Sequence, residues 1–398
     1  MSETSTLIQS RRVWLAGQFS PLQLEIKDGR IDGVYPYALR DPDIDYKDNR
    51  ILPGFMDIHT HGAYGFDTND ADPEGLRKWA GRLPEEGVAS FLPPTVSDLP
   101  PGLTASVKNV ADVTETGYEG AEILGIHLEG PYLDMERRGA QPPEAVVPAD
   151  VEEFERYQQA ARGMIRYITL APEHDEGLRL TKYCAQNGVA VSMGHSGASY
   201  EQALLAAANG ALSATHVYNG MSPFHHREPG LLGAALRLRN LFGEIICDGL
   251  HAHPAAVYHF FAAKGPDFPI MVTDSLRVKN CPPGGIYRLG GHEIEVDRDG
   301  AARLKDSGTL AGSTLRMNRG LKFLVEEAMI PFYAALNACT INPARLLGED
   351  RRKGKLAAGY DADIVILADD YEVIQTYCRG RIVYTAAKYP ADWQYQKN

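Results

Sequence analysis

Pro53-Gly-Phe-Met-Asp-Ile-His-Thr-His-Gly62 is the segment that says most about the architecture of this chain. Residues 55–58 are apolar apart from one aspartate and predict a buried strand, after which Gly62 opens a loop. Side chains at positions i and i+2 of a strand point to the same side, so His59 and His61 face the same way. Two such histidines can bind one metal ion, but they can equally form a hydrogen-bonded turn. The rest of the chain has to distinguish these readings.

Length and charge limit the classes of protein to consider. The chain has 398 residues, enough for one large α/β domain and a smaller unit. The 52 acidic residues outnumber the 40 basic ones and give a formal charge of -12. A nucleic-acid-binding surface is normally basic, so we expect no nucleic-acid partner. An anionic small molecule stays compatible with this charge, because a few local arginines can outweigh the global field.

Cysteine usage and the N-terminus bear on the compartment. The five cysteines are widely spaced and form no Cys-x-x-Cys motif, which argues against a disulfide framework and suits a reducing compartment. The sequence starts without a signal-peptide pattern, and no apolar run approaches the roughly 18 residues that span a bilayer. We therefore expect a cytoplasmic protein with no membrane segment.

A repeated alternation of short apolar runs and amphipathic segments dominates the middle of the chain. Eight such runs predict strands, at residues 54–61, 89–96, 123–129, 165–171, 190–195, 211–217, 244–248 and 269–274. Helical patterns lie between them, for example at 72–86, 151–162, 176–187 and 200–209. Eight β/α units predict an α/β protein of the (β/α)8 TIM-barrel type. A doubly wound open sheet is the alternative, but the first strand is followed by no Gly-x-Gly-x-x-Gly.

The two ends of the chain have a different pattern. Both contain short strands and tight turns, such as the predicted hairpin turn at Asp28-Gly29, and neither has enough apolar surface to be stable alone. We predict a small β-sandwich domain formed by both termini, residues 1–53 with 355–398. The barrel then comprises residues 54–354, with a hairpin insert at about 278–307 and closing helices at 314–348.

Metal-capable side chains end five of the eight apolar runs. Catalytic residues of a TIM barrel lie at the carboxyl ends of its strands, so these side chains should converge at one mouth. Three histidines or carboxylates plus water form the usual shell of a catalytic zinc ion. The pairs His59/His61 and His195/His216 can each hold a metal, with Glu129 shared. The residues at the ends of the runs are His59, His61, Glu129, His195, His216 and Asp274.

Other polar residues allow two interpretations each. His127 alternates with Glu129 and is either a support for the metal site or a core histidine. The loop containing Arg227 is either a solvated turn or a clamp for an anion such as phosphate, because guanidinium binds phosphate in a bidentate manner. At least one of His251 and His253 should face the mouth.

The combined motifs resemble the amidohydrolase superfamily, and within it the N-acetylglucosamine-6-phosphate deacetylase family. The metal-capable residues and the terminal segment Gly359-Tyr-Asp-Ala-Asp-Ile-Val365 carry the first resemblance. The dihydroorotase and hydantoinase relatives use a carboxylated lysine on strand four. Run four here reads Tyr167-Ile-Thr-Leu-Ala-Pro-Glu173 and contains no lysine, which disfavours those relatives. The second resemblance rests on His127-Leu-Glu-Gly-Pro, Met193-Gly-His-Ser, Thr215-His-Val-Tyr-Asn-Gly-Met, His226-Arg-Glu-Pro-Gly and Leu310-Ala-Gly-Ser.

This resemblance implies a metal-dependent hydrolysis of N-acetylglucosamine 6-phosphate to glucosamine 6-phosphate and acetate. One or two divalent ions, Zn²⁺ or Fe²⁺, would be held by Glu129, His195 and His216 and by His59 and His61. Asp274 would act as general base and then general acid. A homodimer is implied, in which Arg227 and His251 contact the sugar phosphate. The other implied substrate contacts are Ala140, Asn219, Gly220 and Leu310.

Two departures from the family pattern concern substrate selection. Many members carry a histidine in the loop where this chain has Gln141, so Gln141 must do any such work. After Asp274, where small residues are usual, this chain has the bulkier and cationic segment Ser275-Leu276-Arg277. N-acetylgalactosamine 6-phosphate or another N-acyl compound is therefore an alternative substrate. A catalytically dead barrel is the alternative from another class, but a dead relative should have lost some of the ligands, and all are present.

Overall fold

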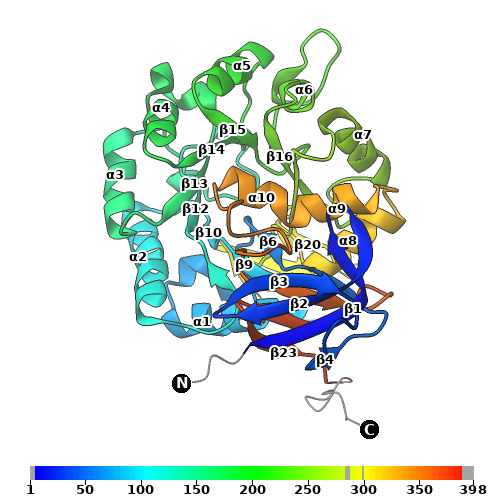
Figure 1. The fold of residues 1–398 in the computed structure, drawn as a ribbon. Coiled ribbons are helices and arrows are strands. Elements are labelled where there is room, and N and C mark those ends of the chain that lie inside the picture. Colours follow the sequence, from blue (N-terminus) through cyan, green and yellow to red (C-terminus); the bar gives the residue numbers. More distant parts are fainter. Residues whose placement is uncertain (1–4, 283–286, 298–299, 388–398) are drawn as a thin grey trace.

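The computed structural model describes residues 5–282, 287–297 and 300–387. Its larger part is a curled parallel sheet surrounded by helices (Figure 1). Hydrogen bonds order seven strands as β10-β12-β13-β14-β15-β16-β17 and three more as β11-β9-β6. The strands are β6 (Phe55–Asp57), β9 (Val88–Phe91), β10 (Pro94–Thr95), β11 (Glu122–Ile123), β12 (Ile126–Glu129), β13 (Ile165–Leu170), β14 (Ala190–Met193), β15 (Ala211–Ala214), β16 (Phe242–Ile246) and β17 (Pro269–Val272).

These strands match the eight apolar runs, because β9 with β10 and β11 with β12 are each one run interrupted once. Helices follow the runs in chain order, as α1 (Pro73–Arg82), α2 (Pro100–Thr116), α3 (Val151–Ala160), α4 (Arg179–Gln186), α5 (Tyr200–Ala208), α6 (Gly230–Arg237), α7 (Pro254–Lys264) and α8 (Met317–Glu326). The helices α9 (Phe332–Cys339) and α10 (Ile341–Leu346) complete this part. The expected α/β alternation is confirmed.

Local sequence explains where helices begin and end. Asp72 caps α1 by accepting a hydrogen bond from the backbone of Glu74, and Ser199 forms a capping box with Gln202 at α5. Gly188 and Gly210 lie just past the ends of α4 and α5 with positive φ, a conformation that glycine adopts without steric cost. The buried apolar faces of these helices pack on the parallel strands in the main core.

Strands from both ends of the chain form a second sheet, ordered β23-β22-β21-β5-β1-β2-β3, with β4 also paired to β1. The antiparallel pairing of β5 with β21 joins the N-terminal and C-terminal pieces. The predicted sandwich is therefore one continuous hydrogen-bonded sheet rather than two separate sheets, because β1 pairs along both of its edges. The strands are β1 (Thr6–Leu15), β2 (Gln18–Lys27), β3 (Arg30–Pro36), β4 (Ile44–Asp45), β5 (Arg50–Pro53), β21 (Ile364–Leu367), β22 (Val373–Cys378) and β23 (Arg381–Thr385).

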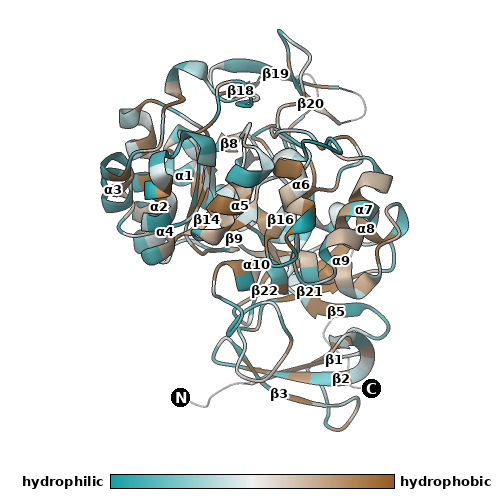
Figure 2. Cartoon of the chain, turned by 90° about the horizontal axis from the view of Figure 1, so that it is seen from above, coloured by the Kyte–Doolittle hydropathy of each residue, from teal (hydrophilic) through white to brown (hydrophobic). Residues whose placement is uncertain are grey.

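The insert after β17 is a three-stranded antiparallel sheet, not a simple hairpin. It contains β18 (Tyr287–Leu289), β19 (His292–Val296) and β20 (Ala302–Leu304). Figure 2 shows this insert and the terminal sheet at opposite ends of the molecule. Residues 283–286 and 298–299 of the predicted insert, and 1–4 and 388–398 of the predicted terminal domain, lie outside the described residues.

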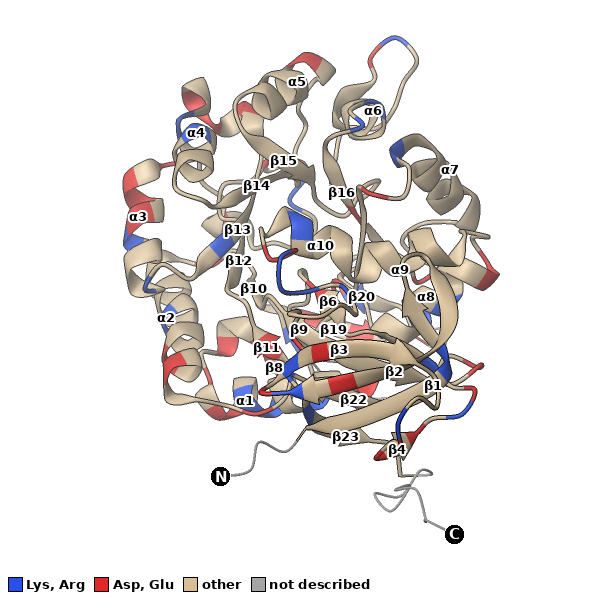
Figure 3. Cartoon of the chain, in the orientation of Figure 1, with Lys and Arg blue, Asp and Glu red and all other residues tan. Residues whose placement is uncertain are grey.

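Charged residues of both signs occur on the helices that surround the parallel sheet (Figure 3). Acidic and basic residues are interspersed along the outer helices α1 to α4 in Figure 3. All five cysteines are free thiols. Within the described ranges, no helix is both long and apolar enough to cross a bilayer.

Candidate active site

The six metal-capable residues converge at the carboxyl ends of the parallel strands. Glu129 is the last residue of β12, whereas His195, His216 and Asp274 each lie two residues beyond a strand end. These last three have φ values of 47°, 28° and 48°, in the left-handed region that non-glycine residues seldom adopt. Such a backbone costs about 1–3 kcal/mol per residue and is typical of functional sites. The fold therefore sustains local strain where these side chains enter the site.

Glu129 lies at the centre of the cluster. Its Oε1 atom is 3.3 Å from His59 Nε2, 3.3 Å from His195 Nε2 and 3.4 Å from His216 Nε2. Its Oε2 atom is 3.3 Å from His61 Nε2. The carboxylate thus faces both histidine pairs, as the prediction of a shared Glu129 requires.

The outer nitrogens of three histidines already have acceptors. His195 Nδ1 lies 2.9 Å from the carbonyl oxygen of Arg137, and His216 Nδ1 lies 3.1 Å from that of Asn219. His59 Nδ1 lies 2.8 Å from Glu244 Oε2. Each Nδ1 must therefore donate, so each neutral ring presents a bare Nε2 lone pair to the Glu129 carboxylate. Positive charge, from a metal ion or from protons, is needed between these atoms.

The spacing of the donor atoms fits divalent metal ions. Donors roughly 2.0–2.2 Å from a tetrahedral ion stand about 3.4 Å apart. His195 and His216 Nε2 are 3.1 Å apart and complete one group with Glu129. His59 and His61 Nε2 are 3.3 Å apart and form a second group with Asp274, whose Oδ1 is 3.5 Å and 3.2 Å from them. Both donor sets are nitrogen and carboxylate ligands that suit Zn²⁺ or Fe²⁺.

The pKa shifts of the two buried carboxylates also indicate that the site requires positive charge. Burial alone would raise the pKa of Glu129. When protons rather than a metal ion supply the positive charge, the charges of His59 and His195 and the hydrogen bonds donated by His195 and His216 hold that pKa well below its usual range. Burial opposes ionisation of Asp274 as well, yet His59 and His61 lower its pKa. His127 behaves oppositely, because burial and the neighbouring His59 charge lower its pKa well below the usual value. His127 is therefore neutral and is not part of the charged cluster.

A cavity of about 240 Å³ opens over this cluster. Polar groups line its floor, and Leu276 of the β17 loop and Leu289 of β18 contribute apolar wall. Of the residues that the sequence singled out, the cavity is lined by His61, Glu129, Ala140, Gln141, His195, His216, Asn219, Gly220, His251, Asp274 and Leu310. His59 lies beneath the lining and is fully buried.

Arg227 and His253 are candidates that this arrangement does not bring to the cavity. The loop of Arg227 extends away from the sheet just before α6 (Figure 1), and the Arg227 side chain is exposed beside His226. His251 does reach the cavity, held by Asp248 Oδ2 at 2.7 Å from its Nδ1. His253 instead caps α7 by accepting a hydrogen bond from Ala255.

The two departures from the family pattern differ in position. Gln141 Nε2 donates to Glu129 Oε2 at 2.7 Å, and its Oε1 accepts from the backbone of Ser97 at 2.6 Å. Arg277 instead pairs with Asp70 at 2.8 Å and points into a neighbouring cavity. Gln141 is therefore the departure that contacts the cluster, and the bulk beside Asp274 in the main cavity comes from Leu276.

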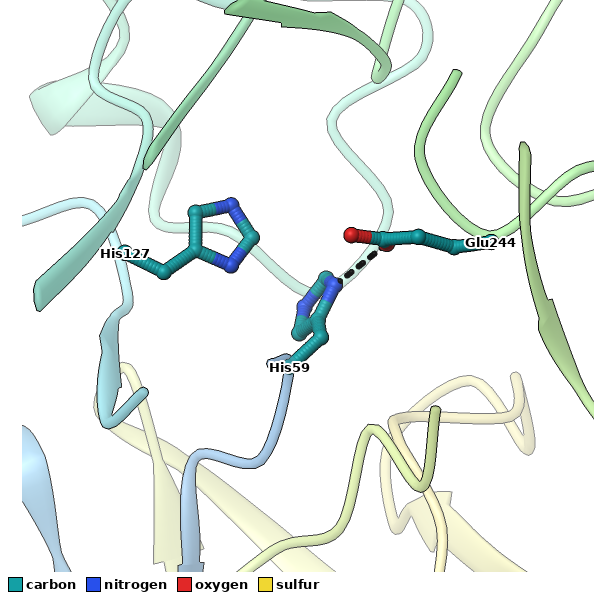
Figure 4. Close-up of side chains that lie close together, drawn as sticks. All are labelled: His59, His127 and Glu244. Atoms are coloured by element: carbon teal, nitrogen blue, oxygen red, sulfur yellow. Dashed lines mark hydrogen bonds and ion pairs between the residues drawn. The ribbon is translucent and has the colours of Figure 1, made fainter. Parts of the chain in front are cut away.

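Glu244 and the precise position of His127 were not identified as site features from the sequence. Figure 4 shows His59 between these two side chains, with its hydrogen bond to Glu244 drawn. The His127 and His59 rings meet edge to face at 4.6 Å, and His127 Nε2 bonds Thr169 Oγ1 at 2.8 Å. His127 thus supports the site from below. A carboxylate inside the buried strand Phe242–Ile246 was the available signal for Glu244.

Known proteins are similar to this chain in both sequence and structure. The Amidohydrolase family matches residues 50–383. The N-acetylglucosamine-6-phosphate deacetylase of Bacillus subtilis is 43% identical over 368 residues, covering 90% of this chain and 92% of the relative. The N-acetylgalactosamine-6-phosphate deacetylase of Escherichia coli O157:H7 is 34% identical over 380 residues, covering 95% and 99%.

A solved structure extends this similarity to the whole fold. The N-acetyl-D-glucosamine-6-phosphate deacetylase of Mycobacterium smegmatis, an aspartate-to-alanine variant in complex with N-acetyl-D-glucosamine 6-phosphate, superposes with a TM-score of 0.90. It is 32% identical and covers 96% of this chain and 100% of its own. The chain therefore belongs to the amidohydrolase family, in the group that contains the N-acetylglucosamine-6-phosphate deacetylases.

Proposed function

We propose that this protein hydrolyses N-acetylglucosamine 6-phosphate to glucosamine 6-phosphate and acetate. The observation that carries the proposal is the arrangement of two nitrogen and carboxylate donor sets around Glu129, with Asp274 facing the same cavity. The 43% identity to the Bacillus subtilis deacetylase over nearly the whole chain supports the same substrate. The presence of all six side chains in one cluster argues against a catalytically dead barrel.

The reaction needs a water nucleophile, a proton acceptor and a proton donor. A divalent ion bound to these residues would lower the pKa of a water to about 7 and polarise the acetamide carbonyl. Asp274 is positioned to accept the water proton as the C–O bond forms. The same carboxyl group then delivers that proton to the sugar nitrogen as the C–N bond breaks. Acetate and the free amine are the products.

The substrate contacts are proposed from the cavity lining. Asn219 and Gly220 offer backbone and amide groups beside the two histidines of one donor set, while Ala140 and Leu310 shape the walls. His251 suits the phosphate, because Asp248 raises the pKa of this imidazole against the effect of burial. A cationic His251 would meet the anionic end of the sugar.

The reaction itself can be tested by product analysis. The purified, metal-loaded protein is incubated with N-acetylglucosamine 6-phosphate while acetate and free amine are followed by proton NMR. We expect the two products in equal amounts, with no reaction after the metal has been removed by a chelator. Absence of both products from a metal-loaded sample would refute the proposed function.

We propose that the protein is a homodimer in which Arg227 of one subunit binds the phosphate of the sugar held in the other subunit's cavity. The Arg227 side chain is exposed in the single chain. The change Arg227→Ala should raise KM for the phosphorylated sugar roughly 10- to 100-fold with little change in kcat, because a charge-assisted contact is lost. Arg239→Ala, another exposed arginine, is the matched control. An equal loss with unphosphorylated N-acetylglucosamine would argue against a phosphate contact.

Gln141 is proposed to orient Glu129 for catalysis. The change Gln141→Leu should lower kcat/KM about 10- to 100-fold, because Glu129 loses its hydrogen-bond donor and the Ser97 amide loses its acceptor. Gln141→His, which restores the side chain common in the family, should retain more activity. Steady-state kinetics with parallel metal analysis would check this, and an unaffected Gln141→Leu enzyme would exclude the role.

We also propose which metal the site binds and in which compartment the protein works. The ion is Zn²⁺ or Fe²⁺, because both accept histidine and carboxylate ligands. The five free thiols favour a reducing compartment, and we place the protein in the cytoplasm.

We also propose that the parallel strands close into a complete (β/α)8 barrel. The eight strand positions run from β6 to β17, and backbone hydrogen bonds link the two ends of the array. The Asp274 amide donates to the His59 carbonyl at 2.8 Å, and the Gly62 amide donates to the Ser275 carbonyl at 2.9 Å. The barrel domain would comprise residues 54–354, and the terminal sheet residues 1–53 with 355–398.

A further inference from the structure

A fully buried polar layer lies directly beneath the six-residue cluster. Only one member of this layer carries a carboxylate, and that residue, Glu244 on β16, is entirely inaccessible to solvent. Burying a carboxylate is costly unless it is paired, so its partner should reveal its role. The layer consists of His127, Tyr167, Thr169, Ser192, Ser213, Thr215 and Glu244.

The partner of Glu244 is a proposed metal ligand. Glu244 Oε2 accepts a hydrogen bond from His59 Nδ1 at 2.8 Å, and a longer one from the backbone amide of His216 at 3.3 Å. The first bond fixes the His59 proton on Nδ1 and turns the bare Nε2 toward Glu129 and Asp274. Figure 4 shows the carboxylate and the imidazole in this contact.

The two donor sets differ in how they are supported. His195 and His216 donate Nδ1 to backbone carbonyls of Arg137 and Asn219, which no substitution removes. His59 donates to a charged side chain instead. A carboxylate acceptor makes an imidazole a stronger ligand than a neutral carbonyl does, because it stabilises the positive charge that a bound ion brings.

A separate ion between His59, His127 and Glu244 is the competing reading. Their ligand atoms lie within 4.8 Å of one another. However, the only lone pair of a neutral His59 with Nδ1 protonated is on Nε2, which faces Glu129 and Asp274. His59 would have to lose both ring protons to bind an ion on each side. The geometry favours a support over a third ion site.

We propose that Glu244 is a positioning residue that secures the ion at His59, His61 and Asp274, whereas the ion at Glu129, His195 and His216 does not depend on it. The proposal rests on the metal centre of the proposed function. Because the histidines of the two sets donate to different acceptors, removal of Glu244 should lower the metal affinity of one set and leave that of the other set unchanged. A general structural role would weaken both sets together.

The test compares Glu244→Gln and Glu244→Ala with the parent protein. Each metal-free protein is titrated with Zn²⁺ by calorimetry, and bound zinc per chain is measured after dialysis. The parent should bind two ions. We expect Glu244→Ala to raise the Kd of one site about 10- to 100-fold and to retain the other site. Glu244→Gln should show a smaller effect, because its amide oxygen still accepts from His59 but carries no charge.

The control variant is Ser213→Ala, which alters the same buried layer without touching a proposed ligand. It should bind two ions with the parent affinities. Melting temperatures of the metal-free proteins show whether Glu244 is needed for folding itself. For Glu244→Gln we expect a value close to the parent value, since the replacement has nearly the same shape.

Three results would overturn the proposal. Unchanged affinities for both ions in Glu244→Ala would exclude the positioning role, and so would an equal loss of both ions. A parent protein that binds one ion, retained by both variants, would leave Glu244 with no ion to secure. A parent that binds no ion would instead refute the metal-dependent function itself, which keeps the two failures distinct.

Discussion

The change Asp274→Asn is expected to lower kcat for acetate release roughly 10²- to 10⁴-fold, the usual contribution of a general base. Asparagine keeps the shape of the side chain and its contact with His61 but cannot accept the water proton. Asp274 faces the cavity at the end of β17, where neighbouring histidines lower its pKa and keep it ionised. Single-turnover kinetics with the phosphorylated sugar would measure the loss.

Metal content decides how that result is interpreted. The set of Glu129, His195 and His216 does not include Asp274, so at least this ion should remain in the variant. Asp267→Asn, an exposed carboxylate paired with Arg345, serves as the control and should leave kcat unchanged. Substantial turnover by a metal-loaded Asp274→Asn protein would exclude Asp274 as the base.

The change Glu129→Gln should have a comparable or larger effect for another reason. Glu129 Oε1 is the point on which His59, His195 and His216 converge, and Oε2 faces His61. A neutral amide would remove the negative charge shared by both donor sets. We expect both ions to bind at least about 10-fold more weakly and acetate release to fall about 10³-fold or more.

Atomic absorption and kinetics on the same samples would check the Glu129→Gln prediction. Glu201→Gln on the exposed surface of α5 should retain the parent metal content and rate. Excess zinc should restore part of the activity, because the histidines are still present. Full metal content with normal turnover would contradict the central place given to Glu129.

Periodicity and strand ends made most of the fold predictable. Each buried apolar run forms part of the parallel sheet. A short strand that is covered on both faces can satisfy its backbone hydrogen bonds only by pairing with the neighbouring strands. The convergence of Glu129 with His195 and His216 followed from that fold, since carboxyl ends of barrel strands meet at one mouth. No spacing rule was needed beyond the position of each residue at the end of its run.

What escaped prediction depends on contacts between residues remote in sequence. The bond between Glu244 and His59 joins residues 185 positions apart, and an isolated glutamate in a strand says nothing about its partner. Aspartate adopts the left-handed backbone of Asp274 more readily than most residues, but at this position it is held by backbone hydrogen bonds to His59 and Ser313, both remote in sequence. Arg227 illustrates a third limit, since its exposed loop is consistent with a partner-subunit contact that one chain cannot display.

The most direct test is acetate release by the metal-quantified protein from N-acetylglucosamine 6-phosphate and N-acetylgalactosamine 6-phosphate side by side. We predict turnover that requires bound metal, with a higher kcat/KM for the gluco sugar. Higher kcat/KM for the galacto sugar would reassign the substrate while preserving the chemistry. No acetate from either sugar, with both donor sets filled, would contradict the deacetylase assignment.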